Sequence, residues 1–368
     1  MRLPSFNDLT LEQLKVYECP PDRSILVVGP PGSGKTSMAI WRARLLVGPE
    51  LNRSVVLVTR NRLLVSVAGE LAKEHDGAAI QATTMSSLIT NCYYSQFGRF
   101  APQYYPFEYI WDEILREYEE AGVQPSIDHL IIDEGQNLPP SFFQWAVRFG
   151  ARAVSVFADE DQSTLGVGSR VSDWRDAGFT EVLPLLVNHR STKEIVDVIE
   201  HFHKDRKLPR AMASRGAGFD RPYLMATPNW EALADTVTAR LINTGEAIGV
   251  IVYRKDEVSY LSSLLRQRLD TARVDSYTSD ANQGAEATIR MRDHGVTVIC
   301  GESAIGLEFD ALYLQDLSRS LPADEAIKNR RLYMLCARAR NKLVLVNGPT
   351  ELTVEQLNSL PPQNILER

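Results

Sequence analysis

The 368-residue sequence is poor in cysteine and has no long apolar run. Its four cysteines, Cys19, Cys92, Cys300 and Cys336, stand far apart, so their spacing provides neither a zinc-binding pair nor a disulfide framework. No apolar stretch approaches the ~18 residues that a membrane-spanning helix needs. The first residues carry acidic side chains among the apolar ones, which is not typical of a secretory signal. We therefore expect a cytoplasmic protein with no membrane partner.

The sequence also lacks an excess of positive charge. Its 40 Lys and Arg residues are outnumbered by 47 Asp and Glu residues, for a formal net charge of −7. Residues 1–183 hold 16 basic and 23 acidic side chains, whereas residues 184–368 hold 24 of each. An acidic chain is poorly suited to non-specific binding of nucleic-acid phosphates. Any nucleic-acid contact is therefore expected in a local groove, more readily one that involves the second half.

Short apolar runs alternate with helical stretches along the whole chain. This alternation predicts an α/β fold in which parallel sheets are covered by helices. We expect two domains, residues 1–183 and residues 184–368. The strands expected in the first half are residues 24–28, 54–59, 129–132 and 153–157. The elements expected in the second half are helices at 231–245, 256–269 and 326–340, and strands at 247–254, 295–300, 311–317 and 342–346.

One motif has a direct chemical meaning. Residues 29–36 follow an expected strand, open an expected helix and match the pattern G-x-x-x-x-G-K-[ST]. Glycines allow the backbone to wrap a phosphate, so that N–H groups and a helix N-terminus face the anion. Lys35 is expected to neutralise the β- and γ-phosphate oxygens of ATP, and the Thr36 hydroxyl to bind Mg²⁺. The expected phosphate-binding residues are Gly29, Pro30, Pro31, Gly32, Ser33, Gly34, Lys35 and Thr36.

Two adjacent carboxylates form a second motif. Asp133 and Glu134 directly follow the apolar run 129–132, at the carboxyl end of an expected strand, where α/β sheets bind their ligands. Asp133 fits a Mg²⁺ contact, and Glu134 fits the base that orients the attacking water. A solvated acidic turn would not explain the apolar run before it. The two motifs together predict ATP hydrolysis.

Six fragments resemble, in the same order, the motifs of the UvrD/Rep-like branch of superfamily 1 helicases. They are Leu11-Glu12-Gln13, Asp133-Glu134-Gly135-Gln136, Ala158-Asp159-Glu160-Asp161-Gln162, Asn188-His189-Arg190-Ser191, Gly306-Leu307-Glu308-Phe309-Asp310 and Cys336-Ala337-Arg338-Ala339-Arg340. Each fragment is short, but six in order are specific. The resemblance implies two RecA-like P-loop NTPase domains with parallel sheets and an ATP site in the cleft between them.

The resemblance also implies a role for individual residues. Gln13 and His189 would contact the adenine base, and Glu308 would contact the ribose. Gln162 would sense the γ-phosphate. These positions complete a nucleotide site around the phosphate-binding motif.

Arg190 and Arg338 occupy the family's arginine-finger positions. A planar guanidinium that is always charged suits the charge that spreads over the γ-phosphoryl oxygens during hydrolysis. Because both arginines lie in the second half, the resemblance implies that hydrolysis is coupled to closure of two domains.

The nucleic-acid-facing positions of the family are largely missing. The family pattern H-S-A-K-G-L-E becomes residues 302–308 here, with Glu302 and Ile305 in place of the basic residues. Residues 163–168 contain none of the family's strand-stacking aromatics, each worth about 1–3 kcal/mol per base. The remaining candidates for a nucleic-acid or partner surface are Arg60, Arg62, Tyr104 and Lys207. Lys207 lies in the segment 205–221, which we expect to be a solvated loop, with a binding surface as the alternative.

Residues 91–122 form a short insertion that is rich in aromatics. Nine of them lie close together, at Tyr93, Tyr94, Phe97, Phe100, Tyr104, Tyr105, Phe107, Tyr109 and Trp111. Helical spacing places Phe107, Trp111, Ile114, Leu115 and Tyr118 on one face, which favours packing. The upstream tyrosines lack this spacing and are open to packing, to stacking on bases or to binding a protein.

Three functions are compatible with these features. The first is an ATP-driven motor that binds or translocates on single-stranded DNA or DNA ends. The second is an ATP-driven switch that acts on a protein partner such as a nuclease, as the helicase-like subunits of Gabija-type two-gene anti-phage systems would. The third, a scaffold that binds nucleotide without hydrolysis, is disfavoured because the hydrolytic residues are all present.

Overall fold

The polypeptide forms two units, each built on its own sheet. The computed structural model describes residues 3–59, 65, 80–163, 168–204, 207–218, 220–278, 294–315 and 317–368. The N-terminal unit comprises Arg2–Gly29 and Gly34–Leu185, and the C-terminal unit comprises Pro30–Ser33 and Leu186–Arg368. Residues 30–33, the tip of the predicted phosphate-binding motif, thus belong to the C-terminal unit, although the residues on either side of them belong to the N-terminal unit.

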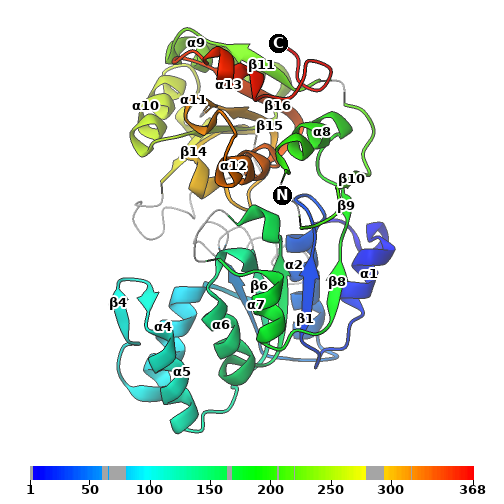
Figure 1. Cartoon of the computed structure of the whole chain (residues 1–368), viewed down its shortest axis with the longest axis vertical. Coiled ribbons are helices and arrows are strands. Elements are labelled where there is room, and N and C mark those ends of the chain that lie inside the picture. Colours follow the sequence, from blue (N-terminus) through cyan, green and yellow to red (C-terminus); the bar gives the residue numbers. More distant parts are fainter. Residues whose placement is uncertain are drawn as a thin grey trace. The chain divides into compact units, whose positions relative to one another are not determined.

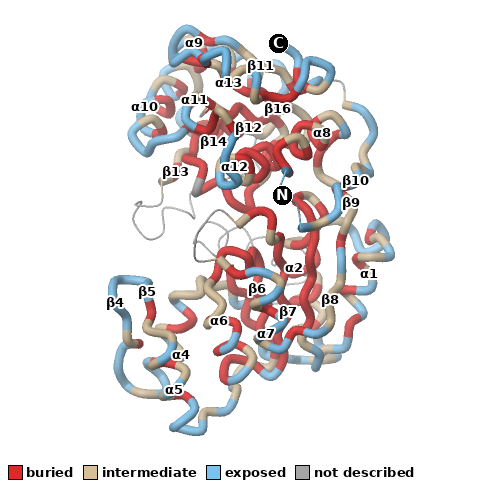
Figure 2. Tube along the Cα trace, in the orientation of Figure 1, coloured by how far each residue is buried: buried red, intermediate tan, exposed pale blue. Residues whose placement is uncertain are grey.

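The N-terminal unit contains a six-stranded sheet in the order β3-β2-β6-β7-β1-β8, with every pair parallel (Figure 1). Its strands are β1 (Ile25–Val28), β2 (Val55–Thr59), β3 (Gln81–Thr84), β6 (Ile127–Asp133), β7 (Ala151–Ala158) and β8 (Val182–Pro184). Strands β1 and β2 are buried along their whole length, as is typical of parallel strands covered on both faces. Figure 2 shows the burial of β1, which is labelled in Figure 1 in the same orientation.

Helices precede and connect the strands of the N-terminal unit. They are α1 (Leu11–Tyr17), α2 (Lys35–Val47), α4 (Met85–Phe97), α5 (Trp111–Glu120), α6 (Pro140–Trp145) and α7 (Val171–Asp176). Short helical turns lie at η1 (Phe6–Asp8), η2 (Gly135–Asn137), η3 (Ala146–Gly150, a π-helical turn) and η4 (Glu160–Gln162). Between α4 and α5 the chain makes an antiparallel hairpin of β4 (Gln103–Tyr105) and β5 (Glu108–Tyr109).

The C-terminal unit contains a second six-stranded parallel sheet, in the order β11-β16-β15-β12-β14-β13. Its strands are β11 (Tyr223–Ala226), β12 (Ala247–Val252), β13 (Val274–Tyr277), β14 (Gly295–Cys300), β15 (Phe309–Leu314) and β16 (Ala339–Asn347). A separate short parallel pair joins β9 (Val187–Asn188) to β10 (Met212–Ala213). The predicted α/β fold with two parallel sheets is therefore confirmed.

Helices cover this second sheet as well. They are α8 (Lys193–Phe202), α9 (Trp230–Thr244), α10 (Lys255–Arg266), α11 (Leu317–Ser320), α12 (Ala326–Cys336) and α13 (Val354–Asn358), with short turns at η5 (Thr271–Arg273) and η7 (Gly301–Ala304). The apolar faces of α9 and α10 pack with β12, β14, β15 and β16 in one core. In the part of the chain that the structure describes, no helix has both the length and the apolar character needed to cross a membrane.

Three sequence expectations need correction. The helix expected over 326–340 ends at Cys336, because Ala339 begins strand β16 and pairs with Phe309 of β15. Phe107 does not share the helical face of Trp111, since it lies in the hairpin turn with a φ of 73° and is 72% exposed. The segment around Lys207 is not wholly a solvated loop, because it contains strand β10.

A buried polar network stabilises the N-terminal unit. His129 of β6 is 1% exposed, and its Nδ1 lies 2.8 Å from the Pro21 carbonyl oxygen. Its Nε2 lies 2.8 Å from Ser155 Oγ, which also accepts a hydrogen bond from Arg42 Nε at 2.8 Å. These partners fit a neutral imidazole with its proton on Nδ1. Burial first, and then the charge of Arg42, lower the pKa of His129 to about 3.

We predict that His129 makes the stability of this unit sensitive to acid. Below the ordinary histidine pKa of about 6.5 the unfolded chain takes up a proton that folded His129 refuses, so stability is lost as pH falls towards 3. The contribution should reach about 1.4 kcal/mol per pH unit. Denaturation between pH 7 and pH 4 should show a shallower dependence in His129→Asn. An unchanged slope would contradict the neutral assignment.

Candidate nucleotide-binding site

The phosphate loop, residues 29–36, connects β1 to the first turn of α2. Gly32 and Gly34 have φ values of 77° and 91°, in the left-handed region that favours glycine. Lys35 is 7% exposed, and its Nζ donates a hydrogen bond of 2.7 Å to the Gly29 carbonyl oxygen. The loop is thus curled around its own lysine, directly at a helix N-terminus, as anion binding requires.

Asn188 holds the tip of this loop within the C-terminal unit. Its Nδ2 donates to the Pro31 carbonyl oxygen at 2.9 Å, and its Oδ1 accepts from the backbone N–H groups of Arg190 and Ser191, both at 2.9 Å. A Cβ atom at Gly32 would lie 2.6 Å from Asn188 Oδ1. Asn188 therefore uses both ends of its amide and leaves no room for a side chain at Gly32.

Both predicted carboxylates stand at the carboxyl end of β6. Asp133 is the last residue of the strand and is 3% exposed. Burial first, and then the charge of Glu134, raise the pKa of Asp133, while Thr36 and Lys35 oppose the rise. Glu134 has a φ of 57°, a left-handed conformation that costs about 1–3 kcal/mol for a residue that is not glycine. Glu134 keeps this conformation because its side chain is buried and accepts a hydrogen bond from Gln136.

A chain of hydrogen bonds joins Glu134 to Gln162. Gln136 Nε2 donates to Glu134 Oε2 at 2.6 Å, and Gln136 Oε1 accepts from the Asp159 backbone N–H at 3.0 Å. Asp159 Oδ2 in turn accepts from Gln162 Nε2 at 2.7 Å. All four side chains are buried. The structure therefore brings the predicted base and the predicted γ-phosphate sensor into one network.

Thr36 and Asp133 fit the requirements of a magnesium ion. The Thr36 hydroxyl lies close enough to the Asp133 carboxylate to oppose the rise in its pKa that burial causes, so the two oxygen ligands lie near each other. Asp133 Oδ1 is buried and has no hydrogen-bond partner among the described residues. Mg²⁺ prefers oxygen ligands and completes its octahedron with phosphate oxygens and water. These residues could hold the ion when a nucleotide supplies the remaining ligands.

Gln13 lies beside the phosphate loop but is already used in a helix cap. Its backbone N–H donates to Thr10 Oγ1 at 3.3 Å, and its Oε1 accepts from the Thr10 N–H at 3.1 Å, forming a capping box at the start of α1. The Nε2 atom would lie 2.6 Å from a Cβ at Gly34. The cap therefore orients the amide next to the loop.

The structure pairs Arg190 with Glu308 in the C-terminal unit. Arg190 Nε lies 2.8 Å from Glu308 Oε2, and Arg190 Nη1 donates to the Ala337 carbonyl oxygen at 3.1 Å. Burial would raise the pKa of Glu308, but the neighbouring positive charges, led by Arg190, hold it below its ordinary value. The predicted finger and the predicted ribose contact therefore form one nearly buried ion pair.

Arg338 is packed inside the C-terminal unit. It is 2% exposed, and its Nε donates to the Met334 carbonyl oxygen at 2.9 Å. Its Nη1 donates to the Leu307 carbonyl oxygen at 3.4 Å. These contacts join the end of α12 to the residue before Glu308. Its role as a second finger stays a prediction.

The structure describes two of the four surface candidates, Tyr104 and Lys207. Arg60 and Arg62 lie outside the described residues. Lys207 is exposed, in the segment that leads to β10. Tyr104 is 72% exposed on the β4–β5 hairpin of the N-terminal unit.

The insertion separates into packed and exposed aromatics. Tyr93 and Tyr109 are buried, and Phe97 and Trp111 are partly buried. The exposed members are Tyr94, Phe100, Tyr104, Tyr105 and Phe107. Residues 91–122 contain two basic and six acidic side chains, so an aromatic surface here would repel phosphates rather than attract them.

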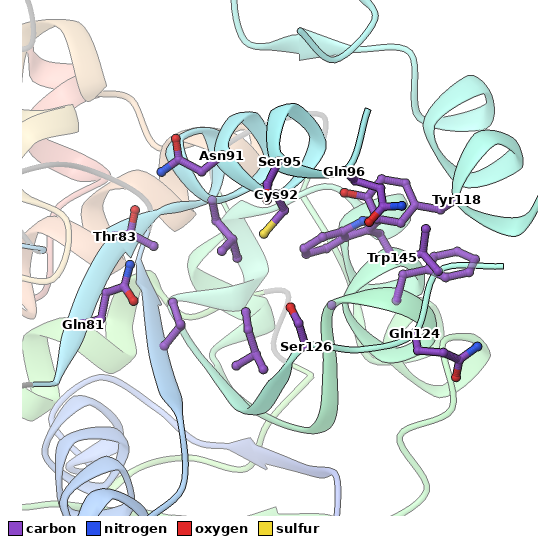
Figure 3. A pocket seen from close by; sticks show the side chains of 16 residues that line it. Gln81, Thr83, Asn91, Cys92, Ser95, Gln96, Tyr118, Gln124, Ser126 and Trp145 are labelled. Carbon is purple, nitrogen blue, oxygen red and sulfur yellow. The ribbon is translucent and has the colours of Figure 1, made fainter. Parts of the chain in front are cut away.

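A hollow in the N-terminal unit differs in chemistry from the phosphate loop. It has a volume of about 360 Å³ and lies between β3, α4 and the end of α6 (Figure 3). Amide and hydroxyl side chains such as Gln81, Asn91 and Ser126 line it, together with Tyr118 and Trp145 (Figure 3). None of its sixteen lining residues is charged. Because phosphates need positive charge or a ring of N–H groups, this hollow is not the predicted nucleotide site.

The sequence motifs did not reveal two residues beside the site. Ser214 Oγ lies 3.0 Å from His189 Nδ1, and Arg215 Nη1 donates to the carbonyl oxygen of Arg190. Both belong to the segment expected to be a solvated loop. A segment rich in Arg and Gly has no periodicity that could have indicated these contacts.

Comparisons with known proteins give similarities of fold. No protein-family model and no curated protein matches the sequence. The C-terminal domain of a possible DNA helicase from Lactobacillus plantarum WCFS1 is 23% identical, with a TM-score of 0.35, and the match covers 48% of this chain and 96% of that one.

Two viral structures match over more of the chain. Arterivirus nonstructural protein 10 (helicase) in complex with DNA is 15% identical, with a TM-score of 0.43, and the match covers 94% of this chain and 65% of that one. The PRRSV helicase is 13% identical, with a TM-score of 0.46, covering 94% of this chain and 56% of that one. The chain thus spans less than two thirds of these viral helicases. At this level of similarity, none of the three assigns a function to the chain.

We predict that the exposed and the packed aromatics of the insertion differ in their effect on stability. Changing Tyr104→Ser with Tyr105→Ser should alter the free energy of unfolding by less than about 0.5 kcal/mol per site, because both side chains are exposed. Tyr93→Ala should cost about 3 kcal/mol, since Tyr93 is fully buried. Urea denaturation measures both values. Equal losses would show that the hairpin tyrosines are packed.

Proposed function

We propose that this chain binds ATP with Mg²⁺ and hydrolyses the bond between its β- and γ-phosphates, as a helicase-like ATPase of the UvrD/Rep-like type. The observation that carries the proposal is the buried hydrogen-bond chain from Glu134 through Gln136 and Asp159 to Gln162. It begins beside Asp133, where the nearby Thr36 hydroxyl of the phosphate loop opposes the rise in pKa that burial causes. A purely structural network would not require a strained Glu134 next to an incompletely paired Asp133.

Each residue has a defined task in the proposed reaction. The loop N–H groups and Lys35 bind the phosphates. The positive charge of Lys35 lowers the electrostatic cost of holding the phosphate charges in the site. A Mg²⁺ ion, held by Thr36 and Asp133 with the phosphates, would neutralise phosphate charge. Glu134 orients the attacking water and accepts its proton, while Gln136 keeps the carboxylate aimed.

Arg190 of the C-terminal unit is proposed to stabilise the charge that develops on the γ-phosphoryl group. Its guanidinium is nearly buried and already partnered by Glu308. A phosphate ligand would therefore have to replace a carboxylate, which exchanges one anionic partner for another. That exchange costs less than exposing an unpaired guanidinium would.

Two uses of the hydrolysis are compatible with this site. We propose coupling to single-stranded DNA as the first, since it follows from the motif order. A switch that acts on a protein partner is the second candidate, and a specific observation favours it. The exposed aromatics of residues 91–122 stand among six acidic side chains, which suits a basic protein better than a nucleic acid.

We predict that Lys35→Ala and Glu134→Gln both abolish hydrolysis but differ in ATP binding. Lys35→Ala should weaken ATP affinity by roughly tenfold or more, because a charge-assisted contact is lost. Glu134→Gln should keep ATP affinity and lower turnover by at least about a hundredfold, the usual size of a general-base effect. A radiolabelled phosphate-release assay with equilibrium ATP binding measures both. Near-normal turnover in Glu134→Gln would show that the base is assigned wrongly.

We predict that the purified chain is a poor helicase. Its ATPase rate should be compared with and without single-stranded DNA, duplex ends and RNA, and its unwinding measured on a tailed duplex, with Lys35→Ala as the inactive control. Stimulation by single strands that falls steeply with salt, and less steeply after Arg60→Ala with Arg62→Ala, would support the motor. Robust unwinding without a partner would overturn the prediction.

A further inference from the structure

A segment beyond the recognised motifs runs alongside residues 186–190. Strands β9 and β10 are parallel neighbours, and Figure 1 labels both at the start of the C-terminal unit. The Met212 N–H donates to the Leu186 carbonyl oxygen at 3.3 Å, and the Ser214 N–H donates to that of Asn188 at 2.9 Å. Strand β10 and Ser214 therefore run beside β9, whose last residue, Asn188, directly precedes His189 and Arg190.

Arg215 extends this contact with its side chain. Its Nη1 donates to the carbonyl oxygen of Arg190 and, at 3.2 Å, to that of Arg340. Its Nη2 donates to Asn341 Oδ1 at 2.9 Å. One guanidinium thus joins the Arg190 backbone to the first residues of strand β16.

The two joined segments also contact each other directly. Ser191 Oγ donates to the Ala339 carbonyl oxygen at 2.7 Å, and the Thr192 N–H donates to that of Arg340 at 3.1 Å. Arg215 therefore adds hydrogen bonds between two segments that are already hydrogen-bonded to each other. The Arg190 carbonyl, by contrast, accepts from Arg215, while the N–H of the same peptide, on Ser191, donates to Asn188, so the two side chains hold the two ends of that peptide.

We propose that Arg215 is a positioning residue for Arg190, and so fixes the position of the arginine on which the proposed hydrolysis depends. This inference rests on the proposed ATPase function. The Arg190 side chain forms an ion pair with Glu308 and donates a hydrogen bond to the Ala337 carbonyl oxygen, and its backbone N–H donates to Asn188 Oδ1. Arg215 fixes the remaining backbone group, the carbonyl oxygen.

The chemistry of the contact requires arginine. The acceptors are two backbone carbonyl oxygens and one side-chain amide oxygen, spread over two segments. A guanidinium presents five N–H donors in a rigid plane and can reach all three at once. A lysine ammonium is a single point on a flexible stem, so it cannot bridge them with the same geometry.

The test compares Arg215→Ala and Arg215→Lys with Arg210→Ala. Arg210 lies on the same segment, but it is exposed and pairs with Asp197, away from Arg190. Arg215→Ala should lower kcat by about tenfold or more with KM changed by less than about threefold, and Arg215→Lys should not restore kcat. Arg210→Ala should match the unmodified chain. The melting temperature is measured for every variant.

Two further measurements separate positioning from a general loss of structure. In an Arg190→Ala background, Arg215→Ala should cause no additional loss of kcat, because it acts through Arg190. Amide hydrogen exchange at Arg190 and Ser191 should accelerate in Arg215→Ala and not in Arg210→Ala. An additive loss of kcat, or unchanged exchange at these two amides, would overturn the proposal.

The exchange experiment does not depend on catalysis. If the unmodified chain fails to hydrolyse ATP, the proposed function fails. Faster exchange in Arg215→Ala would then still support the positioning contact, and unchanged exchange would refute it. Hydrogen exchange therefore tests the positioning contact, and ATP hydrolysis tests the proposed function separately.

Discussion

Parallel strands end at a common edge of a sheet, and the candidate site depends on this constraint. In the N-terminal sheet, β6, β7 and β1 are consecutive neighbours, and each runs directly into a segment of the candidate site. The phosphate loop follows β1, Asp133 ends β6, and Asp159 follows β7. Residues that are far apart in the sequence therefore meet because their strands are adjacent. Burial at this edge then makes every polar group there dependent on a partner.

The strand ends that carry the candidate residues of the N-terminal unit could be predicted from sequence, because these residues belong to short motifs that follow apolar runs. Lys35, Asp133 and Glu134 each follow an apolar run, and the strands formed where those runs predicted them. The hydrogen bonds among Gln136, Asp159 and Gln162 could not be predicted, since they depend on the register between β6 and β7. A motif identifies such residues but not which of them touch.

The second half was harder to predict for two physical reasons. The sequence of residues 326–340 is helix-compatible throughout, but pairing of Ala339 with Phe309 ends the helix earlier. A strand contact between distant segments outweighs a local helical preference. Arg215 and Ser214 lie in a segment without periodicity, and only the tertiary structure places them against Arg190 and His189.

The amide of Asn188 leaves little freedom for sequence change at the tip of the phosphate loop. One base substitution in an asparagine codon produces aspartate, which has nearly the same shape. Aspartate could still accept from the Arg190 and Ser191 N–H groups, but it would turn a charged oxygen towards the Pro31 carbonyl. The hydrogen bond of 2.9 Å would become a repulsion between two oxygens in a buried place. A mutation that most alignments would score as conservative would thus push the loop tip away from its support.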